Sequence, residues 1–234
     1  MTQTCSRSTQ LIVAAVIAVV VIAGLTAFAY TSSNAALKNT AQWGLKSTAG
    51  AMAAQINASE IGGLHAGDEN TTKYLAIAQK LRTMRSMNDD IINAYIVKVN
   101  TTDYSAAFLV DDLYPVDPQG SARIGEIDTS PDKMQIFAAL SGPTVSPQPY
   151  SDSWGSFMSA YAPIDDSLND SSGNTVAVLG IDVAEDDYVK STTQGNWILA
   201  TGFVSIILVL AILWVFGRKA EEMEKDAGEA PKTP

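Results

Sequence analysis

The stretch Tyr150–Val183, YSDSWGSFMSAYAPIDDSLNDSSGNTVAVLGIDV, decides the fold. Two apolar runs, Gly155–Ile164 and Thr175–Val183, enclose the segment Asp165–Asn174, which is built almost wholly from Asp, Ser, Asn and Gly. These residue types favour turns. Two β-rich runs around such a cluster predict an antiparallel hairpin.

Asp182 interrupts the second apolar run. An ionised carboxylate inside a buried strand needs a partner, which is either a protein group or a ligand. In a strand, Val176, Val178, Gly180 and Asp182 share one face. Gly180 brings no side chain to that face, and we therefore expect open space beside Asp182.

The charge of the chain is concentrated in its middle. The formal net charge is −10, and residues 31–195 hold ten Lys and Arg against twenty Asp and Glu. Such an acidic segment repels phosphates, which argues against nucleic acid as a partner.

Few residue types for catalysis or metal binding are present. Cys5 is the one cysteine and His65 the one histidine, which excludes an intrachain disulfide and multi-histidine metal sites. The sequence shows neither a G-x-S-x-G elbow nor a phosphate-binding P-loop. Asp165–Asp170 resembles a calcium loop in composition only, because the final Glu of such a loop is missing. We expect no catalytic residues, no cofactor and no metal, so the chain is not expected to be an enzyme.

Two apolar segments predict membrane-spanning helices. Residues 11–30 and 197–216 carry no charged side chain, and each is long enough to cross about 30 Å of hydrocarbon. The alternative for the first segment, a cleaved signal peptide, has an apolar core of only about 7–15 residues.

The basic residues beside these segments predict the orientation. Arg7 precedes the first segment, and Arg218 and Lys219 follow the second. The positive-inside rule then places residues 1–10 and 217–234 in the cytoplasm. Residues 31–195 form an extracytoplasmic domain of a two-pass protein in the cell membrane, with the lipid bilayer as a partner.

The remaining pattern predicts an α+β domain with an antiparallel sheet and a long N-terminal helix across one face. Small or apolar residues in Asn34–Asn57 have helical spacing and continue the first span without a break. This stripe packs either on the domain's own sheet or in a homodimer seam. A second helix is expected over Thr71–Met87, and a second hairpin over Ile91–Asn100 and Tyr104–Val110. Ser130 is expected to cap a short helix.

Three sequence runs resemble the Cache superfamily, the PAS-like extracytoplasmic sensor domains of receptors. They are PYSDSWGSFMSAYAPI, VAVLGIDV and LHAGDENTTKYLAIAQKLRTMR, and they occur in the order of the single-module type over about residues 35–190. The resemblance implies a PAS-like fold that senses a small solute. In amine- and amino-acid-binding members, an Asp in the G-x-D position of Asp182 holds the ligand's ammonium.

Candidate ligand-binding residues follow from strand alternation and from this resemblance: Asp182, Tyr95, Trp154, Met158, Tyr161 and Arg123. The aromatic residues would supply walls and hydroxyls, and Arg123 would hold a carboxylate. Alternatively, Asp182 pairs with Arg123 and the aromatic residues are core. The ligand classes left open are amines, amino acids and organic acids, although no R-x-W-Y run supports an amino acid.

The expected function is a membrane-anchored sensor that detects a small polar solute. It would signal as a homodimer or through a separate membrane protein, because only eighteen residues follow Phe216. Two alternatives remain. One is a structural or protein-interaction surface subunit with a non-binding fold, and the other is the truncated input half of a receptor kinase or chemoreceptor.

Overall fold

The computed structural model of the chain describes residues 7–164, 177–193 and 195–228. The chain divides into two compact units, one formed by Met1–Ala36 with Thr193–Pro234 and the other by Leu37–Thr192. The predicted turn Asp165–Asn174, with its calcium-loop-like composition, lies outside the described residues, as does Val176.

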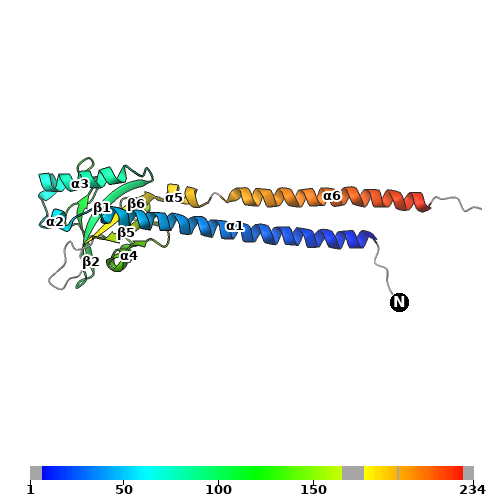
Figure 1. Cartoon of the computed structure of the whole chain (residues 1–234), viewed down its shortest axis with the longest axis horizontal. Coiled ribbons are helices and arrows are strands. Elements are labelled where there is room, and N and C mark those ends of the chain that lie inside the picture. The colour runs from blue at the N-terminus through cyan, green and yellow to red at the C-terminus, as the bar shows by residue number, and fades with distance from the viewer. Residues whose placement is uncertain (1–6, 165–176, 194, 229–234) are drawn as a thin grey trace, which may run out of the picture. The chain divides into compact units, whose positions relative to one another are not determined.

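The described elements confirm the predicted α+β class (Figure 1). In chain order they are α1 (Arg7–Ala53), α2 (Ala58–Ile61), the 3-10 turn η1 (Asp68–Asn70), α3 (Thr72–Arg85), β1 (Ile91–Asn100), β2 (Ser105–Asp111), α4 (Lys133–Ala138), the 3-10 turn η2 (Ala139–Ser141), β3 (Thr144–Val145), β4 (Tyr150–Ser151), β5 (Ser156–Pro163), β6 (Ala177–Ala184), α5 (Glu185–Thr192) and α6 (Asn196–Gly228).

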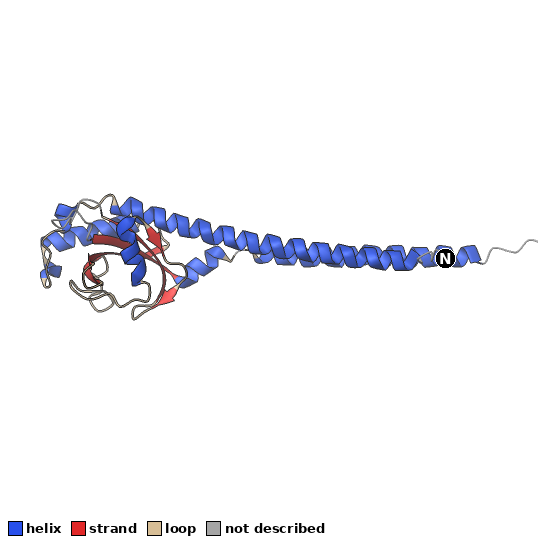
Figure 2. Ribbon diagram, turned by 90° about the horizontal axis from the view of Figure 1, so that it is seen from below, coloured by secondary structure: helices blue, strands red, loops and turns tan. Residues whose placement is uncertain are grey.

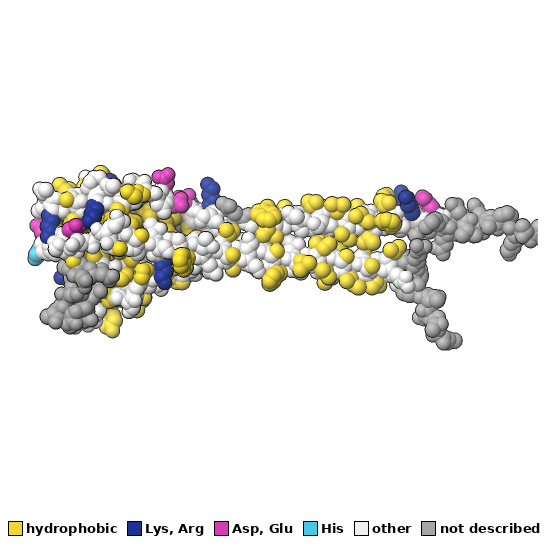
Figure 3. All heavy atoms as spheres, viewed as in Figure 1, with side chains coloured by type: hydrophobic (Ala, Val, Ile, Leu, Met, Phe, Trp, Pro, Cys, Tyr) yellow, Lys and Arg dark blue, Asp and Glu magenta, His cyan; other side chains and the backbone are white. Residues whose placement is uncertain are grey.

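The first unit contains the most apolar helical segments of the chain. Windows of 18 residues in α1 and in the segment Glu185–Lys219 have mean hydropathies of 2.9 and 2.7, and 0% and 6% of these windows are buried. Hydrophobic side chains gather along both long helices in Figure 3. Within this unit the helices approach closely, since a Cβ on Gly202 would lie 2.4 Å from the Thr26 side chain. Length, composition and exposure all fit membrane-spanning helices.

The second unit is built on one antiparallel sheet with the order β2-β1-β6-β5-β3, and β4 pairs with β5. Both predicted hairpins are present. Strand β5 pairs with β6 from Phe157↔Ala184 to Pro163↔Val178, and β1 pairs with β2. The last strand, β6, lies between β1 and β5, so Asp182 occupies the middle of the sheet.

Helices or loops cover both faces of the sheet (Figure 2). Alternate residues of β6 divide between the faces: Leu179 and Ile181 join the core under α1 and α3, and Val178 joins the core beside α4. This two-sided burial explains why β6 is a continuous apolar run and not an alternating one.

The long helix α1 has 47 residues. Leu45 and Met52 of its predicted stripe are buried in the core under the sheet. The stripe therefore packs on the domain itself, as one of the two alternatives predicted. Its use as a homodimer seam remains a prediction.

One local expectation was wrong. The helix expected to begin after Ser130 begins at Lys133, and Asp132 occupies its N-cap position without a side-chain capping bond. The adjacent acidic residues Asp111 and Asp112 are buried, at 2% and 0% exposure. Asp112 is neutralised by Arg85, whose Nε lies 2.7 Å from its Oδ2.

Candidate functional site

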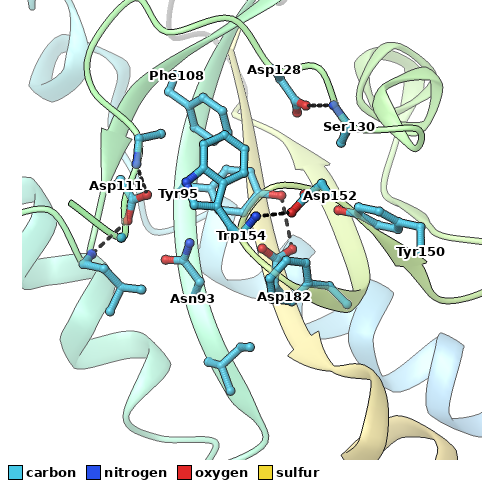
Figure 4. A pocket seen from close by; sticks show the side chains of 15 residues that line it. Asn93, Tyr95, Phe108, Asp111, Asp128, Ser130, Tyr150, Asp152, Trp154 and Asp182 are labelled. Atoms are coloured by element: carbon cyan, nitrogen blue, oxygen red, sulfur yellow. Dashed lines mark hydrogen bonds between the residues drawn. The ribbon is translucent and has the colours of Figure 1, made fainter. Parts of the chain in front are cut away.

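A pocket of about 230 Å³ lies on the face of the sheet that carries Tyr95 and Asp182 (Figure 4). Its lining comes from strands β1, β2, β4, β5 and β6 and from the loops between them. The lining residues are Ile92, Asn93, Tyr95, Phe108, Asp111, Leu113, Gly120, Ala122, Asp128, Ser130, Tyr150, Asp152, Trp154, Phe157 and Asp182.

A bulge in β1 shapes the floor of this pocket. The register with β6 shifts between Ile91 and Asn93, so that Ile91 opposes Val183 and Asn93 opposes Asp182. An extra residue in one strand breaks the simple alternation of side chains. As a result, the neighbours Ile92 and Asn93 both line the pocket.

Gly180 makes room for the ring of Tyr95 and not for a ligand. The two residues are partners across β1 and β6, and a Cβ on Gly180 would lie 2.4 Å from the Tyr95 ring. The ring crosses the glycine, and its hydroxyl donates a hydrogen bond of 3.2 Å to Oδ1 of Asp182. The open space expected beside Asp182 is therefore partly filled by this tyrosine.

A second hydroxyl chain reaches Asp182 from β5. Ser159, the ladder partner of Asp182, donates to Oδ1 at 2.6 Å. Because its single proton is used there, Tyr150 must be the donor in the 2.8 Å bond between its hydroxyl and Ser159 Oγ. Asp182 is thus held by neutral hydroxyl groups.

Burial is the main influence on the charge of Asp182, which is only 6% exposed. Burial raises the pKa of Asp182 to about 7, the hydroxyls of Ser159 and Tyr95 lower it, and the charges of Asp152 and Asp111 raise it further. The carboxylate is therefore costly to ionise at this buried position.

The other carboxylates of the pocket are held mainly by backbone N–H groups. Burial raises the pKa of Asp111 to about 6, although the N–H groups of Leu113 and Ala122 donate to it at 2.9 and 3.0 Å and lower its pKa. Burial also raises the pKa of Asp152, whose Oδ1 accepts from the Trp154 N–H at 2.8 Å. Asp128 is 4% exposed.

The described lining contains four aspartates and no Lys, Arg or His. Arg123, predicted to clamp a carboxylate, is exposed and lies outside the lining, and its backbone N–H donates to Glu126 Oε2 at 3.1 Å. The ion pairs found among the described residues do not join Arg123 to Asp182. The structure thus corrects the placement of Arg123, because its neighbour Ala122 points inward and Arg123 does not.

The structure brings together part of the predicted site. Tyr95 and Trp154 line the pocket with Asp182. Tyr161 lies on the same face, fully buried, with its hydroxyl 3.3 Å from that of Tyr150. Met158 instead packs in the core under the helices. Residues three apart in a strand point to opposite faces, so Met158 and Tyr161 do not share a wall. Ligand binding by these residues remains a prediction.

Sequence reasoning missed several lining residues. Asn93, Asp128, Ser130, Tyr150 and Asp152 come from a bulge, loops and a two-residue strand, which have no periodic pattern. The sequence predicts Asp152 only as a turn residue before Trp154 and Gly155. Among the described residues, no group of three His, Cys, Asp or Glu side chains is arranged to hold a metal ion.

No protein-family model and no curated protein matches the chain. Among solved structures, the chain is similar to the crystal structure of the E. coli DcuS sensor domain, with a TM-score of 0.42 and 16% identity over 68% of this chain and 97% of that one. It is also similar to the Vibrio cholerae LuxQ periplasmic domain, with a TM-score of 0.42 and 12% identity over 72% of this chain and 69% of that one. Both similarities concern the fold alone.

Proposed function

We propose that the chain is a membrane-anchored sensor whose extracytoplasmic domain binds a small amine and catalyses no reaction. The observation that carries this proposal is the pocket lined by four aspartates, with no basic side chain among its described lining residues. Buried carboxylates without a cationic partner are unfavourable. A bound ammonium would supply the missing positive charge.

The lining favours an amine over the other ligand classes. An organic acid would add negative charge to a pocket of carboxylates, and the carboxylate of an amino acid would find no guanidinium or ammonium there. The aromatic walls suit a cation, because ring faces attract positive charge. Phe108 packs between Tyr95 and Trp154, with ring centroids 5.4 and 5.6 Å away.

A short, continuous segment of the chain also connects the pocket to the apolar helix α6. Strand β6 carries Asp182 and ends at Ala184, and α5 begins at the next residue, Glu185. Helix α5 is followed closely by α6. A ligand that shifts β6 would act on this segment, and the signal would pass to a separate membrane protein or to a second copy of the chain.

Thermal unfolding of the full chain in detergent micelles tests the binding claim. Amines, amino acids and organic acids are added separately. A ligand at about 100 times its Kd adds about 2.7 kcal/mol of stability, which for a chain of this size raises the melting temperature by roughly 5–10 °C. We expect shifts with amines and none with organic acids.

Two variants make this test specific. Asp182→Asn should remove the amine-dependent shift, and Asp89→Asn should keep it, because Asp89 is exposed and outside the pocket. Stabilisation by organic acids alone would refute the proposal. If no small molecule changes the melting temperature, the protein-interaction alternative is favoured.

Thiol labelling on intact cells tests the membrane topology. The native Cys5 should resist an impermeant reagent. In a Cys5→Ser background, a cysteine placed by Thr102→Cys in the exposed β1–β2 turn should react. Labelling of Cys5 without labelling at position 102 would reverse the proposed orientation.

A further inference from the structure

Four polar residues of the pocket form two separate pairs, apart from Asp111 and Asp152. Asn93 and Asp182, ladder partners on β1 and β6, form what we term the sheet end. Asp128 and Ser130, from the loop before α4, form the loop end. Figure 4 shows these two ends apart, with Tyr95 and Trp154 between them.

Each end holds a buried oxygen without a partner. Oδ1 of Asn93 at the sheet end and Oγ of Ser130 at the loop end are buried and make no hydrogen bond to any described residue. Ser130 as a whole is only 5% exposed. Buried polar atoms of this kind are unfavourable unless a donor reaches them. A ligand N–H would satisfy both atoms, because Asn93 Oδ1 can only accept and Ser130 Oγ can accept as well as donate.

Each end also holds an aspartate with a spare oxygen. At the sheet end, the bonds from Ser159 and Tyr95 both go to Oδ1 of Asp182. At the loop end, Oδ1 of Asp128 accepts from the Ser130 N–H at 2.7 Å. Among the described residues, the hydrogen bonds to Asp182 and to Asp128 go to Oδ1, and Oδ2 of each accepts none. A carboxylate has about four acceptor positions, so both can still receive an ammonium.

The wall between the two ends is aromatic. Trp154 meets Phe108 edge-on, with an interplanar angle of 72°, and Phe108 in turn contacts Tyr95. Such a surface suits methylene groups, and ring faces also tolerate a nearby cation. Besides Asp111 and Asp152, the pocket thus presents two acceptor pairs with aromatic side chains between them.

We infer that the ligand carries two amino groups joined by a short hydrocarbon chain, with one ammonium at the sheet end and the other at the loop end. This inference rests on the proposed function, because it specifies the amine that the same pocket binds. A ligand with a single ammonium would donate to the acceptors at one end, and the aspartate and the unpaired oxygen at the other end would receive no hydrogen bond from it. A diamine places an ammonium against the acceptors at both ends.

Isothermal titration of the full chain in detergent micelles tests the inference without any substitution. Straight-chain diamines of increasing length are compared with monoamines of the same carbon number, at a pH where the aspartates are ionised. The best diamine should bind at least about tenfold more tightly than its matched monoamine, because it makes a second charge-assisted contact. Affinity should pass through a maximum with chain length, since the two ends are a fixed distance apart.

Three variants locate the two ammonium groups. Asp128→Asn keeps the shape of the loop end and should weaken diamine binding about tenfold, more than it weakens binding of the matched monoamine. Asp182→Asn should weaken both ligands. Asp89→Asn, with the same loss of charge at an exposed position, should change neither.

The outcomes separate this inference from the proposed function. Equal affinity for matched monoamines and diamines would overturn the two-ended ligand and leave amine binding intact. An unchanged preference for diamines in Asp128→Asn would overturn the placement at the loop end. Binding of organic acids without binding of any amine would overturn both proposals.

Discussion

Replacing Asp182 by Asn should stabilise the ligand-free protein, and the gain should depend on pH. Folding buries this carboxylate among hydroxyl groups, and burial raises the pKa of Asp182 from 3.8 to about 7. Between these two pKa values, the folded state retains a proton that the unfolded state has released. Stability therefore falls as the pH rises through this window, and it stays low above the folded-state pKa.

The size of the effect follows from the shift. The difference between 3.8 and about 7 corresponds to about 4 kcal/mol of destabilisation once the carboxylate is fully ionised. Asn keeps an Oδ1 that can accept from Ser159 and Tyr95, but it gains an amide N–H₂ that has no acceptor provided for it. Subtracting about 2 kcal/mol for that unpaired donor, we expect a net gain of roughly 2 kcal/mol at alkaline pH and little or no gain in acid.

Melting of the full chain in detergent, without ligand, measures this difference. At about pH 8.5 the variant should melt roughly 4–8 °C above the parent protein, and at about pH 5 the gap should close or reverse. Asp89→Asn provides the control, because it removes an exposed carboxylate. A variant that is less stable than its parent at alkaline pH would refute the reasoning, since it would mean that Asp182 has a cationic partner in the folded protein.

Three further predictions use other contacts of the same domain. Amine affinity should rise from about pH 5 to about pH 8, because a proton competes with the amine at Asp182, whose pKa burial raises to about 7. Calorimetric titration in buffers of different ionisation heat should detect the released proton, and an affinity that does not change with pH would contradict the prediction. Gly180→Ala should cost about 1–3 kcal/mol in denaturant unfolding, because its Cβ would meet the Tyr95 ring at 2.4 Å, whereas Gly44→Ala on α1 meets no atom within 4 Å and should be neutral or stabilising. Met158→Ala should cost about 2–5 kcal/mol yet leave amine affinity unchanged in the folded fraction, since Met158 lies in the core under the helices.

Periodic patterns allowed most of the fold to be predicted from the sequence. Strand β1 has the predicted bounds, Ile91–Asn100, and α3 differs from its predicted range by two residues or fewer at each end. These elements are long, and their apolar spacing reflects local geometry. The start of α4 was less well predicted, because the capping signal at Ser130 lies two residues before the N-cap position, which Asp132 occupies.

The sequence is sufficient to predict which side chains of β5 share a face of the sheet. Strand alternation alone places Phe157, Ser159 and Tyr161 on one face and Met158 on the other. The expectation that Met158 and Tyr161 act together ignored this parity.

The loop end of the pocket had no local signal in the sequence. Asp128 reaches the pocket because its N–H donates to Ala106 O at 2.8 Å and because Ile127 pairs with Ala107. These contacts tie the loop to β2 across about twenty residues of chain. Such pairing depends on the tertiary fold, and Asp128 is indistinguishable by sequence from a solvated loop aspartate.

The contrast between Asp112 and Asp182 supports the proposal that the pocket binds a cation. Both carboxylates are buried. For Asp112 the fold supplies a guanidinium, with Arg85 Nε 2.7 Å away. For Asp182 the described residues supply the hydroxyls of Ser159 and Tyr95, and the lining around it adds further aspartates. The fold thus pairs one buried carboxylate with a guanidinium, whereas the other faces a pocket whose described lining contains no basic side chain, which is why we propose that an amine binds there.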